Sequence, residues 1–444
     1  MAQLYKLWND LRGSYWFMPT LMSLAAAILS FVMTAIDGAI GNGWVDVVPW
    51  VYRIQAEGAR GLLTTVAGSM IGVAGVTFSI TIAALSYTTS TLGPRLLTNF
   101  MNDTGNQITL GTFVSTFVYC LLALRTVQAG DDGAAFVPHL SLLVAMGFAI
   151  ASLAVLIYFI HHITESLHVS NVVGNVAHDL DAALASFSVR ADQARDKPPT
   201  YLPADFSESA VAITSDNHGY IQNLVHTTLV RQAAAHDLVL RLERAPGDFV
   251  ADGQTLLWAW PPTRIDEDIA ATLTGAYALG RQRTQSQDVG FLVNELVEIA
   301  ARALSPGIND PYTAMGCMDW LAAALIRLAR EDIGSLHYFD SDDRLRLWVP
   351  AFNFRTLTLA VFDQLRPYFA SDRNAALHML EHIGAIGAFV HGGEARRILR
   401  EQADALHEAA GHATPNERDR TQLQQAHRRA LRRIAPTGGA SSIA

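Results

Sequence analysis

Acidic, basic and amide side chains recur between residues 283 and 310 at spacings that could support chemistry. Asp288, Glu295 and Glu298 fall within about a third of the circumference of a single helix. Carboxylates gathered in this way could hold a divalent cation or act as acid and base. The candidate residues for a ligand site or an interface are Arg283, Asp288, Glu295, Glu298, Arg302, Asn309 and Asp310.

Structural roles compete with a ligand site for the same residues. Arg302 stands four residues after Glu298, which is the spacing of an ion pair on a helix surface. Asp310 precedes Pro311, where a carboxylate could cap the start of the next helix. The chain has no Walker loop, dinucleotide-binding glycine pattern or HExxH motif. We therefore assign no catalytic residue and no cofactor, and an enzyme is the weaker expectation.

A second group of polar residues follows the last apolar segment of the chain. His161, Glu165 and His168 share one helical face, and His162 stands beside them. These side chains could bind a transition metal or respond to pH. Di-iron bundles use two Glu-x-x-His fragments, whereas this chain has one, formed by Glu165 and His168. The third explanation is an ordinary helix end at a membrane surface.

Four apolar segments of about 20 residues each precede these histidines, and each has the length that crosses a bilayer as a helix. The expected spans are residues 17–36, 62–85, 108–127 and 140–160. Six of the 32 Lys and Arg residues precede His161, so this half is nearly free of charge. The sequence thus predicts an integral membrane α-helical bundle over residues 1–160, with the first span a retained signal anchor.

Small residues mark one side of the second span. They are Gly61, Thr65, Gly68, Gly72, Gly75, Ser79 and Ser86. Gly68 and Gly72 form a GxxxG pair, which lets two helix backbones approach closely in lipid. Helix packing, within the bundle or between protomers, and the lining of a water-filled pore are both consistent with this pattern. A parallel stripe of Thr77, Thr81 and Thr88 could face hydrated ions or bond its own backbone.

A soluble α+β tail is expected after the membrane bundle. We predict a juxtamembrane helix and linker over 161–200, a small β module over 201–262, a helical domain over 263–435 and a disordered tail over 436–444. Residues 245–256 resemble the "G-D-x-V-x-x-G-x-x-L" turn of lipoyl and biotinyl barrel-sandwich folds. Residues 210–260 contain no lysine to carry either group, so only the fold type is inferred.

The run from Ala303 to Ala314, with Arg283-Thr284 and Gln287-Asp288 upstream, resembles the bacterial family of predicted membrane proteins called domain of unknown function 2254. The resemblance extends over nearly the whole chain. Further matching pieces are Trp8, Leu11-Arg12, Phe78-Ser79-Ile80, Pro94-Arg95, the run 117–120 and the run 158–162. A departure occurs at Tyr87-Thr88-Thr89, where the family has a Gln- and Ser-bearing segment. The resemblance implies four spans and a soluble domain, and supplies no reaction.

Charge and cysteine content narrow the partners and the compartment. A net charge of −9 with no concentrated basic face disfavours nucleic acid as a partner. The two cysteines, Cys120 and Cys317, predict no disulfide framework. The Lys and Arg count is tied between the two sides of the membrane, which leaves the side of the tail open. Reduced thiols favour the cytoplasm, and we expect a multi-pass protein of the bacterial inner membrane.

The leading functional hypothesis is an oligomeric channel or conductance regulator, with the tail acting as gate or sensor. The small-residue stripe and the absence of Asp, Glu, Lys and His deep inside the spans motivate it, because many proton-coupled transporters need such groups. The alternative is a non-conducting scaffold that presents the tail to a partner. A membrane-tethered hydrolase using residues 305–311 is the third. The expected partners are the lipid bilayer, other copies of the chain and ions.

Overall fold

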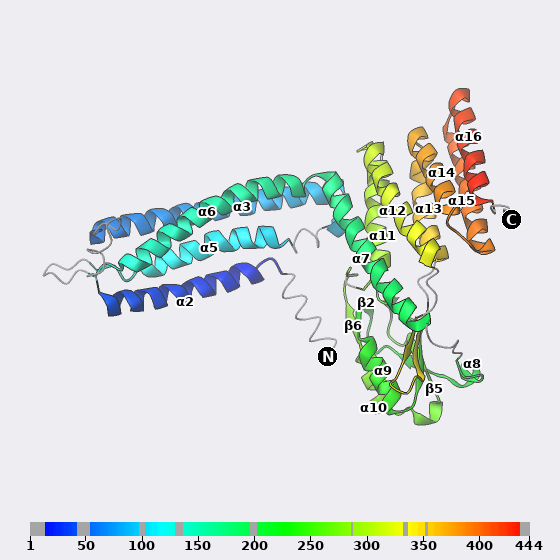
Figure 1. The fold of residues 1–444 in the computed structure, drawn as a ribbon, viewed down its shortest axis with the longest axis horizontal. Coiled ribbons are helices and arrows are strands. Elements are labelled where there is room, and N and C mark those ends of the chain that lie inside the picture. Colours follow the sequence, from blue (N-terminus) through cyan, green and yellow to red (C-terminus); the bar gives the residue numbers. More distant parts are fainter. Residues whose placement is uncertain are drawn as a thin grey trace, which may run out of the picture. The chain divides into compact units, whose positions relative to one another are not determined.

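The computed structural model describes residues 14–41, 54–96, 103–128, 136–195, 202–285, 287–331, 336–350 and 354–435. The chain folds as two compact units, one over residues 8–90 and 94–168 and the other mainly over residues 169–444 (Figure 1). We call the first of these units the membrane unit and the second the soluble unit. The predicted tail of 436–444 lies outside the described residues.

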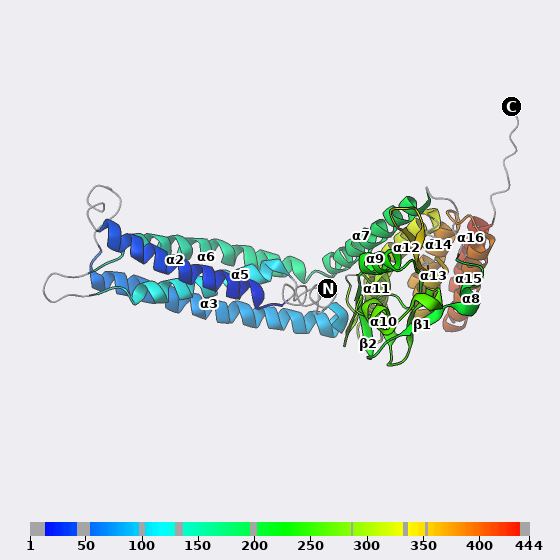
Figure 2. The same cartoon turned by 90° about the horizontal axis from the view of Figure 1, so that it is seen from below.

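The membrane unit consists of four long helices that run side by side (Figures 1 and 2). They are α2 (Phe17–Ile40), α3 (Ala56–Thr91), α5 (Thr104–Leu124) and α6 (His139–Ser166), with a short 3-10 turn, η2 (Pro94–Leu96), after α3. All four are long and apolar enough to cross a membrane, which confirms the predicted four-helix bundle. At 36 residues α3 is roughly 54 Å long, so it exceeds the hydrocarbon thickness and the predicted span.

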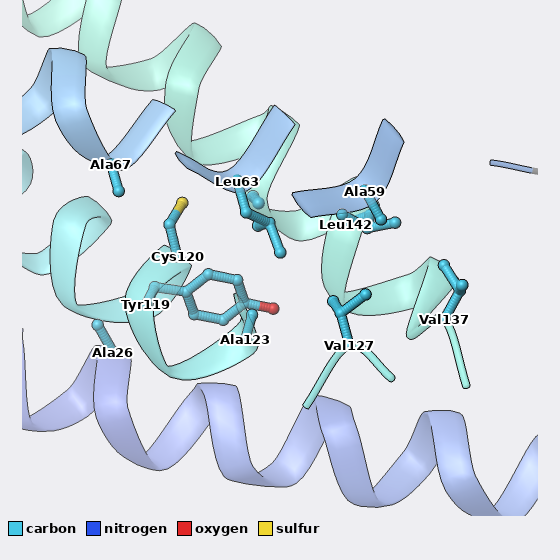
Figure 3. Packing of buried hydrophobic residues seen from close by; sticks show 11 residues of the cluster. Ala26, Ala59, Leu63, Ala67, Tyr119, Cys120, Ala123, Val127, Val137 and Leu142 are labelled. Atoms are coloured by element: carbon cyan, nitrogen blue, oxygen red, sulfur yellow. The ribbon is translucent and has the colours of Figure 1, made fainter. Parts of the chain in front are cut away.

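Small side chains form much of the bundle core. Ala26 of α2, Ala59 and Ala67 of α3 and Ala123 of α5 are buried together, and the ring of Tyr119 lies among them (Figure 3). The Tyr119 hydroxyl donates a hydrogen bond to the Ser141 carbonyl at 3.2 Å. Without a hydrophobic driving force between helices in lipid, such small residues favour close packing, which is tightest between α2 and α5.

One buried carboxylate joins the first and last spans. Asp37 lies in α2, which ends at Ile40 rather than at residue 36. Its carboxylate accepts hydrogen bonds from the Leu140 and Ser141 backbone N–H groups at 2.8 and 2.9 Å, and from the Ser141 hydroxyl at 2.7 Å. Asp37 therefore caps α6 from a neighbouring helix and satisfies donors that the helix itself leaves open.

Two small sheets form part of the soluble unit, together with α7 (Val169–Arg195) and the short helix α8 (Phe206–Ser209). The first sheet has the order β1 (Val211–Thr214), β5 (Thr255–Trp260), β3 (Val239–Leu242), β8 (Leu345–Val349) and β7 (Leu336–Phe339). Only β3 and β8 pair in parallel in this sheet. The second sheet is antiparallel, in the order β4 (Phe249–Val250), β2 (Gly219–Leu224) and β6 (Tyr277–Gly280).

The region predicted as a helical domain, 263–435, contains strands as well as helices, because β6, β7 and β8 lie within it. β7 and β8 form a hairpin whose turn is fixed by Asp340. Its carboxylate accepts hydrogen bonds from the backbone N–H groups of Asp342 and Arg344, both at 2.9 Å. Strands of four and five residues carry too few alternations to stand out in a sequence dominated by helical periodicity.

Helices make up the rest of the soluble unit. They are α9 (His226–Ala235), η3 (Pro262–Arg264), α10 (Glu267–Thr274), α11 (Val289–Ala303), α12 (Pro311–Glu331), α13 (Phe354–Phe369), α14 (Arg373–Gly387), α15 (Gly393–Ala413) and α16 (Glu417–Ile434). Figure 1 shows α11 to α16 as an array of neighbouring helices. Gly384 allows α14 and α16 to approach closely, because a Cβ at this position would lie only 2.8 Å from the Ala430 Cα atom. The soluble α+β architecture is confirmed.

Candidate functional site

The small-residue stripe of α3 lies on the exposed side of that helix. All seven residues from Gly61 to Ser86 are exposed, whereas Leu63, Ala74 and Thr81 on the opposite side are buried. A Cβ placed at Gly61, Gly68, Gly72 or Gly75 meets no described atom within 4 Å. The stripe is therefore not used for packing among the described residues of the bundle. We call this surface, Gly61, Thr65, Gly68, Gly72, Gly75, Ser79 and Ser86, the glycine stripe.

Hydroxyl groups on both sides of α3 bond to the helix itself. Thr65 and Ser79 of the glycine stripe donate to the carbonyls of Gly61 and Gly75 at 2.7 and 2.8 Å. Thr77, Thr81 and Thr88 are buried and also bond backbone carbonyls of their own helix, at 2.9 to 3.0 Å. The threonine stripe thus faces the bundle core, and its hydroxyls serve their own backbone.

Large apolar side chains border the glycine stripe. Ile71 and Ile82 are exposed along one edge, and Val76, Ile80 and Tyr87 along the other. Between these apolar side chains, the glycines leave the helix backbone without a covering side chain. Such a surface can contact the backbone of another helix or a column of water, whereas lipid chains are normally met by large apolar side chains.

The histidines at the end of α6 do not gather in one place. His161 Nε2 lies 3.4 Å from Glu165 Oε1, and both side chains are largely exposed. α6 ends at Ser166, so His168 stands outside the helix and does not continue the face that carries His161. A metal or pH role for His161, His162, Glu165 and His168 stays a prediction.

His162 faces a carboxylate that sequence reasoning missed. Its Nε2 atom lies 2.7 Å from Asp103 Oδ2, and its ring stacks on Tyr158 at 5.2 Å between centroids. Asp103 also caps α5 by accepting a hydrogen bond from the Gly105 backbone N–H at 2.7 Å. An Asp before Thr104 is a readable capping signal. Its contact with a residue 59 positions later is not readable from spacing.

Arg283 and Asp288 form a two-bond ion pair in the soluble unit. Arg283 Nε and Nη2 donate to the two oxygens of Asp288 at 2.7 and 2.9 Å. Asp288 also caps α11 by accepting from the Phe291 backbone N–H at 2.9 Å. Gly247, at φ +97°, comes so close that a Cβ there would collide with the Asp288 carboxylate. This carboxylate is thus engaged in several structural contacts at once.

A cavity of about 520 Å³ adjoins this ion pair. Arg283, Asp288, the turn at Pro246-Gly247, His226 and Tyr338 are among its lining residues. The glycine-bearing turn and the Arg283–Asp288 segment, both singled out in the sequence, therefore meet at one cavity. The other five residues of the predicted 283–310 group do not line this cavity.

Those remaining residues have individual structural positions. Glu298 and Arg302 pair at 3.2 Å, as their spacing predicts. Asp310 caps α12 by accepting from the Thr313 backbone N–H at 3.1 Å, and Asn309 adopts a left-handed φ of 53° in the preceding turn. Glu295 is buried within α11. The seven residues are spread over a cavity rim, the buried side of α11, an ion pair and the start of α12, and their part in a ligand site or an interface stays a prediction.

Sequence reasoning also missed a group formed by Asp319, His378 and His382. Over the described ranges, it is the one set of three or more His, Cys, Asp or Glu residues whose ligand atoms all lie within 4.8 Å of one another. The readable signal was His378 and His382, four residues apart on a helical pattern. Asp319 comes from another helix, 59 positions before His378, and no spacing rule indicates it.

Four apolar spans followed by a soluble α+β unit define an integral membrane protein. Residues 12–385 match the family model for a predicted membrane protein, DUF2254, and the chain belongs to that family. Uncharacterised proteins of Mycobacterium bovis and Mycobacterium tuberculosis are each 29% identical over 435 residues, which cover 96% of this chain and 82% of theirs. No solved structure matches the chain. The resemblance found in the run from Ala303 to Ala314 is confirmed.

Proposed function

We propose that the protein forms a homo-oligomer in the bilayer, in which the glycine stripes of neighbouring copies meet around a path for small ions. The observation that carries this proposal is the exposed position of Gly68, Gly72 and Gly75, where added Cβ atoms would meet no atom of the described residues within 4 Å. A soluble monomer surface tolerates such a stripe, but a helix in lipid gains nothing from leaving its backbone uncovered.

The packing of the bundle supports an external partner for α3. α2 lies close against α5, and α5 against α6, whereas α3 approaches its neighbours less closely. The glycine stripe runs from Gly61 to Ser86, roughly 38 Å at 1.5 Å per residue, which exceeds the hydrocarbon thickness of about 30 Å. A second copy, or a ring of copies, can therefore engage the stripe over the full depth of the bilayer.

The composition of the stripe indicates the kind of path that it would form. Its seven residues are Gly, Ser and Thr, without an ionisable side chain. A path lined in this way is weakly polar and has no fixed charge to select between cations and anions. We expect conductance with little charge selectivity, and we assign gating to the soluble unit.

The same proposal places the protein in the bacterial inner membrane with the soluble unit in the cytoplasm. Cys317, the cysteine of the soluble unit, is unpaired and buried, in keeping with a reducing compartment.

Ion flux through liposomes tests the path. The purified full-length protein should release a small reporter ion, and Gly72→Leu should abolish that release by placing a large side chain where the stripes of neighbouring copies meet. The matched control is Gly147→Leu on α6, where the glycine is also exposed and a Cβ also meets no described atom within 4 Å. Flux that survives Gly72→Leu, or is absent from the unmodified protein, would contradict conduction along α3.

An engineered thiol separates conduction from the scaffold alternative. Ser79→Cys introduces an exposed thiol on the stripe, while Cys120 and Cys317 are buried. Burial raises the pKa of the Cys317 thiol to about 12, which keeps it unreactive. Reaction of the introduced thiol with a charged, membrane-impermeant thiol reagent supports a water-filled path. Disulfide cross-linking between copies without such reaction supports the dry interface of a scaffold, and Ile150→Cys on the exposed side of α6 is the lipid-facing control.

A further inference from the structure

Two histidines on successive turns of α14 face one carboxylate of α12. His378 Nε2 lies 2.6 Å and His382 Nε2 lies 2.7 Å from Asp319 Oδ1. The two nitrogens lie 3.1 Å from each other. Three ligand atoms from two helices thus converge on one point. All three residues belong to the soluble unit and are independent of the glycine stripe.

We propose that Asp319, His378 and His382 bind a divalent transition-metal ion of the zinc type. Two imidazoles and one carboxylate suit zinc, cobalt or nickel, whereas magnesium and calcium prefer oxygen ligands alone. Histidines four residues apart on a helix present their rings to the same side, which is the arrangement of helix-borne zinc ligands.

Hydrogen bonding alone does not satisfy the three contacts. Each Nε2 atom can donate its proton to Asp319 Oδ1, but the two nitrogens, 3.1 Å apart, then face each other as two donors. If instead one Nε2 carries no proton and accepts a hydrogen bond from the other, it faces the carboxylate oxygen, and two acceptors are then in contact. A metal cation in place of the two protons removes this conflict, because both Nε2 atoms and the carboxylate oxygen can then coordinate the same ion.

The geometry requires only small movements to bind an ion. Bonds of roughly 2.0 to 2.1 Å in a tetrahedral site place ligand atoms about 3.3 Å apart. The present separations are 2.6, 2.7 and 3.1 Å, so the sides of the triangle open by about 0.7, 0.6 and 0.2 Å to reach these bond lengths. The side chains are 28%, 21% and 54% exposed for His378, His382 and Asp319, which leaves an ion a way in from solvent.

One of the three proposed ligands also lines a cavity. His378 also lines a cavity of about 590 Å³, together with Glu381 and residues of α16 that include Arg429 and Arg433. A three-ligand site beside such a space can hold water or a small anion at its open position, as three-ligand zinc sites do.

A second His, His and Asp group provides a matched control within the soluble unit. His427 Nε2 lies 2.6 Å from Asp404 Oδ1, but the ring of His407 stacks flat on His427 at 4.5 Å. Its ligand atoms do not all come within 4.8 Å of one another. His427→Ala therefore removes a histidine and a His–Asp contact without removing a converging ligand.

The test uses the full-length protein in detergent after treatment with a chelator. Titration with Co²⁺ should give visible d–d absorption that saturates at one ion per chain, and Zn²⁺ should displace it. His382→Ala should weaken Zn²⁺ binding at least about 100-fold, because losing a ligand costs more than the 10- to 100-fold of an outer partner. His427→Ala should bind as the unmodified protein does.

Asp319→Asn separates a metal site from a hydrogen-bonded tie between helices. The amide keeps an oxygen acceptor for the imidazoles but lacks the negative charge that a metal ligand supplies. Zn²⁺ should raise the Tm of the unmodified protein and of His427→Ala, but not that of Asp319→Asn, whose own folding is checked by circular dichroism. Failure of the unmodified protein to bind Zn²⁺, or equal binding by His382→Ala, would overturn the site.

Discussion

The membrane unit and the soluble unit satisfy their polar groups in different ways. Hydroxyls of the membrane helices bond mostly within the same helix, as Thr77 bonds the Ala74 carbonyl at 3.0 Å. In the soluble unit, charged side chains join elements far apart in sequence. Arg346 of β8 contacts Asp237, 109 positions earlier, at 2.8 Å, and Arg327 of α12 contacts Asp181 of α7.

This difference follows from the two solvents. In lipid, no water replaces a missing hydrogen bond, so helices satisfy their backbone internally and the few bonds between helices are exceptions. In water, an ion pair costs little when it is broken at the surface but much when one partner is buried. Packing of small residues therefore holds the membrane unit together, while ion pairs with one buried partner, such as Arg346 with Asp237, join distant elements of the soluble unit.

Arg346→Ala should produce the largest effect on stability. Its side chain is 5% exposed and lies 2.7 Å from Asp340, which is itself only 7% exposed. Removing the guanidinium leaves a buried carboxylate without its counter-charge, at a cost of about 3–5 kcal/mol. Thermal unfolding of the full-length protein in detergent measures the loss. The control is Arg344→Ala, whose guanidinium is 66% exposed and 3.8 Å from Asp237, with an expected cost below about 1 kcal/mol.

Acid should weaken the same ion-pair network. Burial raises the pKa of Asp340, but hydrogen bonds from the Arg344 backbone N–H and the Arg346 side chain outweigh it and leave the pKa below its ordinary value. Hydrogen bonds from Arg346 and Arg264 also lower the pKa of Asp237. Such depressed values stabilise the fold above the unfolded pKa of about 3.9, and this stability is lost as pH falls through the folded values.

The Tm of the full-length protein should therefore decline progressively as the pH falls below about 5. Arg346→Ala should start lower and decline less steeply, because its two carboxylates return toward ordinary pKa values. Parallel declines for the two proteins would show that other groups control the acid response.

Local features of the chain could be predicted from sequence. Four spans could be predicted because each needs only a run of apolar residues. The small residues from Gly61 to Ser86 could be placed on one side of α3 by their spacing. Asp310 as the cap of α12 follows from its place before Pro311. Each of these features depends on residues that lie close together in the sequence.

Contacts between distant segments could not be predicted. β8 pairs in parallel with β3, about a hundred residues earlier, and neither short strand indicates the other. Asp37 reaches Leu140 across 103 positions, and Asp319 meets His378 across 59. A carboxylate on a helix has many structural explanations, and only the fold shows which donor it faces. The division of the predicted 283–310 group between a cavity rim and helix ends has the same cause.

Asp37→Ala tests the main exception within the membrane unit. The substitution leaves the Leu140 and Ser141 backbone N–H groups at the start of α6 without their acceptor. We expect a loss of about 1–3 kcal/mol, the usual cost of leaving buried donors unsatisfied. Ser141→Ala removes only the hydroxyl bond and should cost about 1 kcal/mol. Unfolding in detergent measures both, and equal losses would show that the backbone caps contribute nothing.

The smallest expected effects distinguish bonds within a helix from bonds between helices. The Thr116 hydroxyl of α5 lies 3.1 Å from the Ser152 hydroxyl of α6, and both are buried. Thr116→Val should cost about 0.6 kcal/mol, the average for such bonds in membranes. Thr77→Val removes a hydroxyl that bonds only a carbonyl one turn away on α3, so its cost should be close to zero. If Thr77→Val proves as costly as Thr116→Val, bonding within the helix stabilises the membrane unit as much as bonding between helices. The two units then differ mainly in the buried ion pairs of the soluble unit.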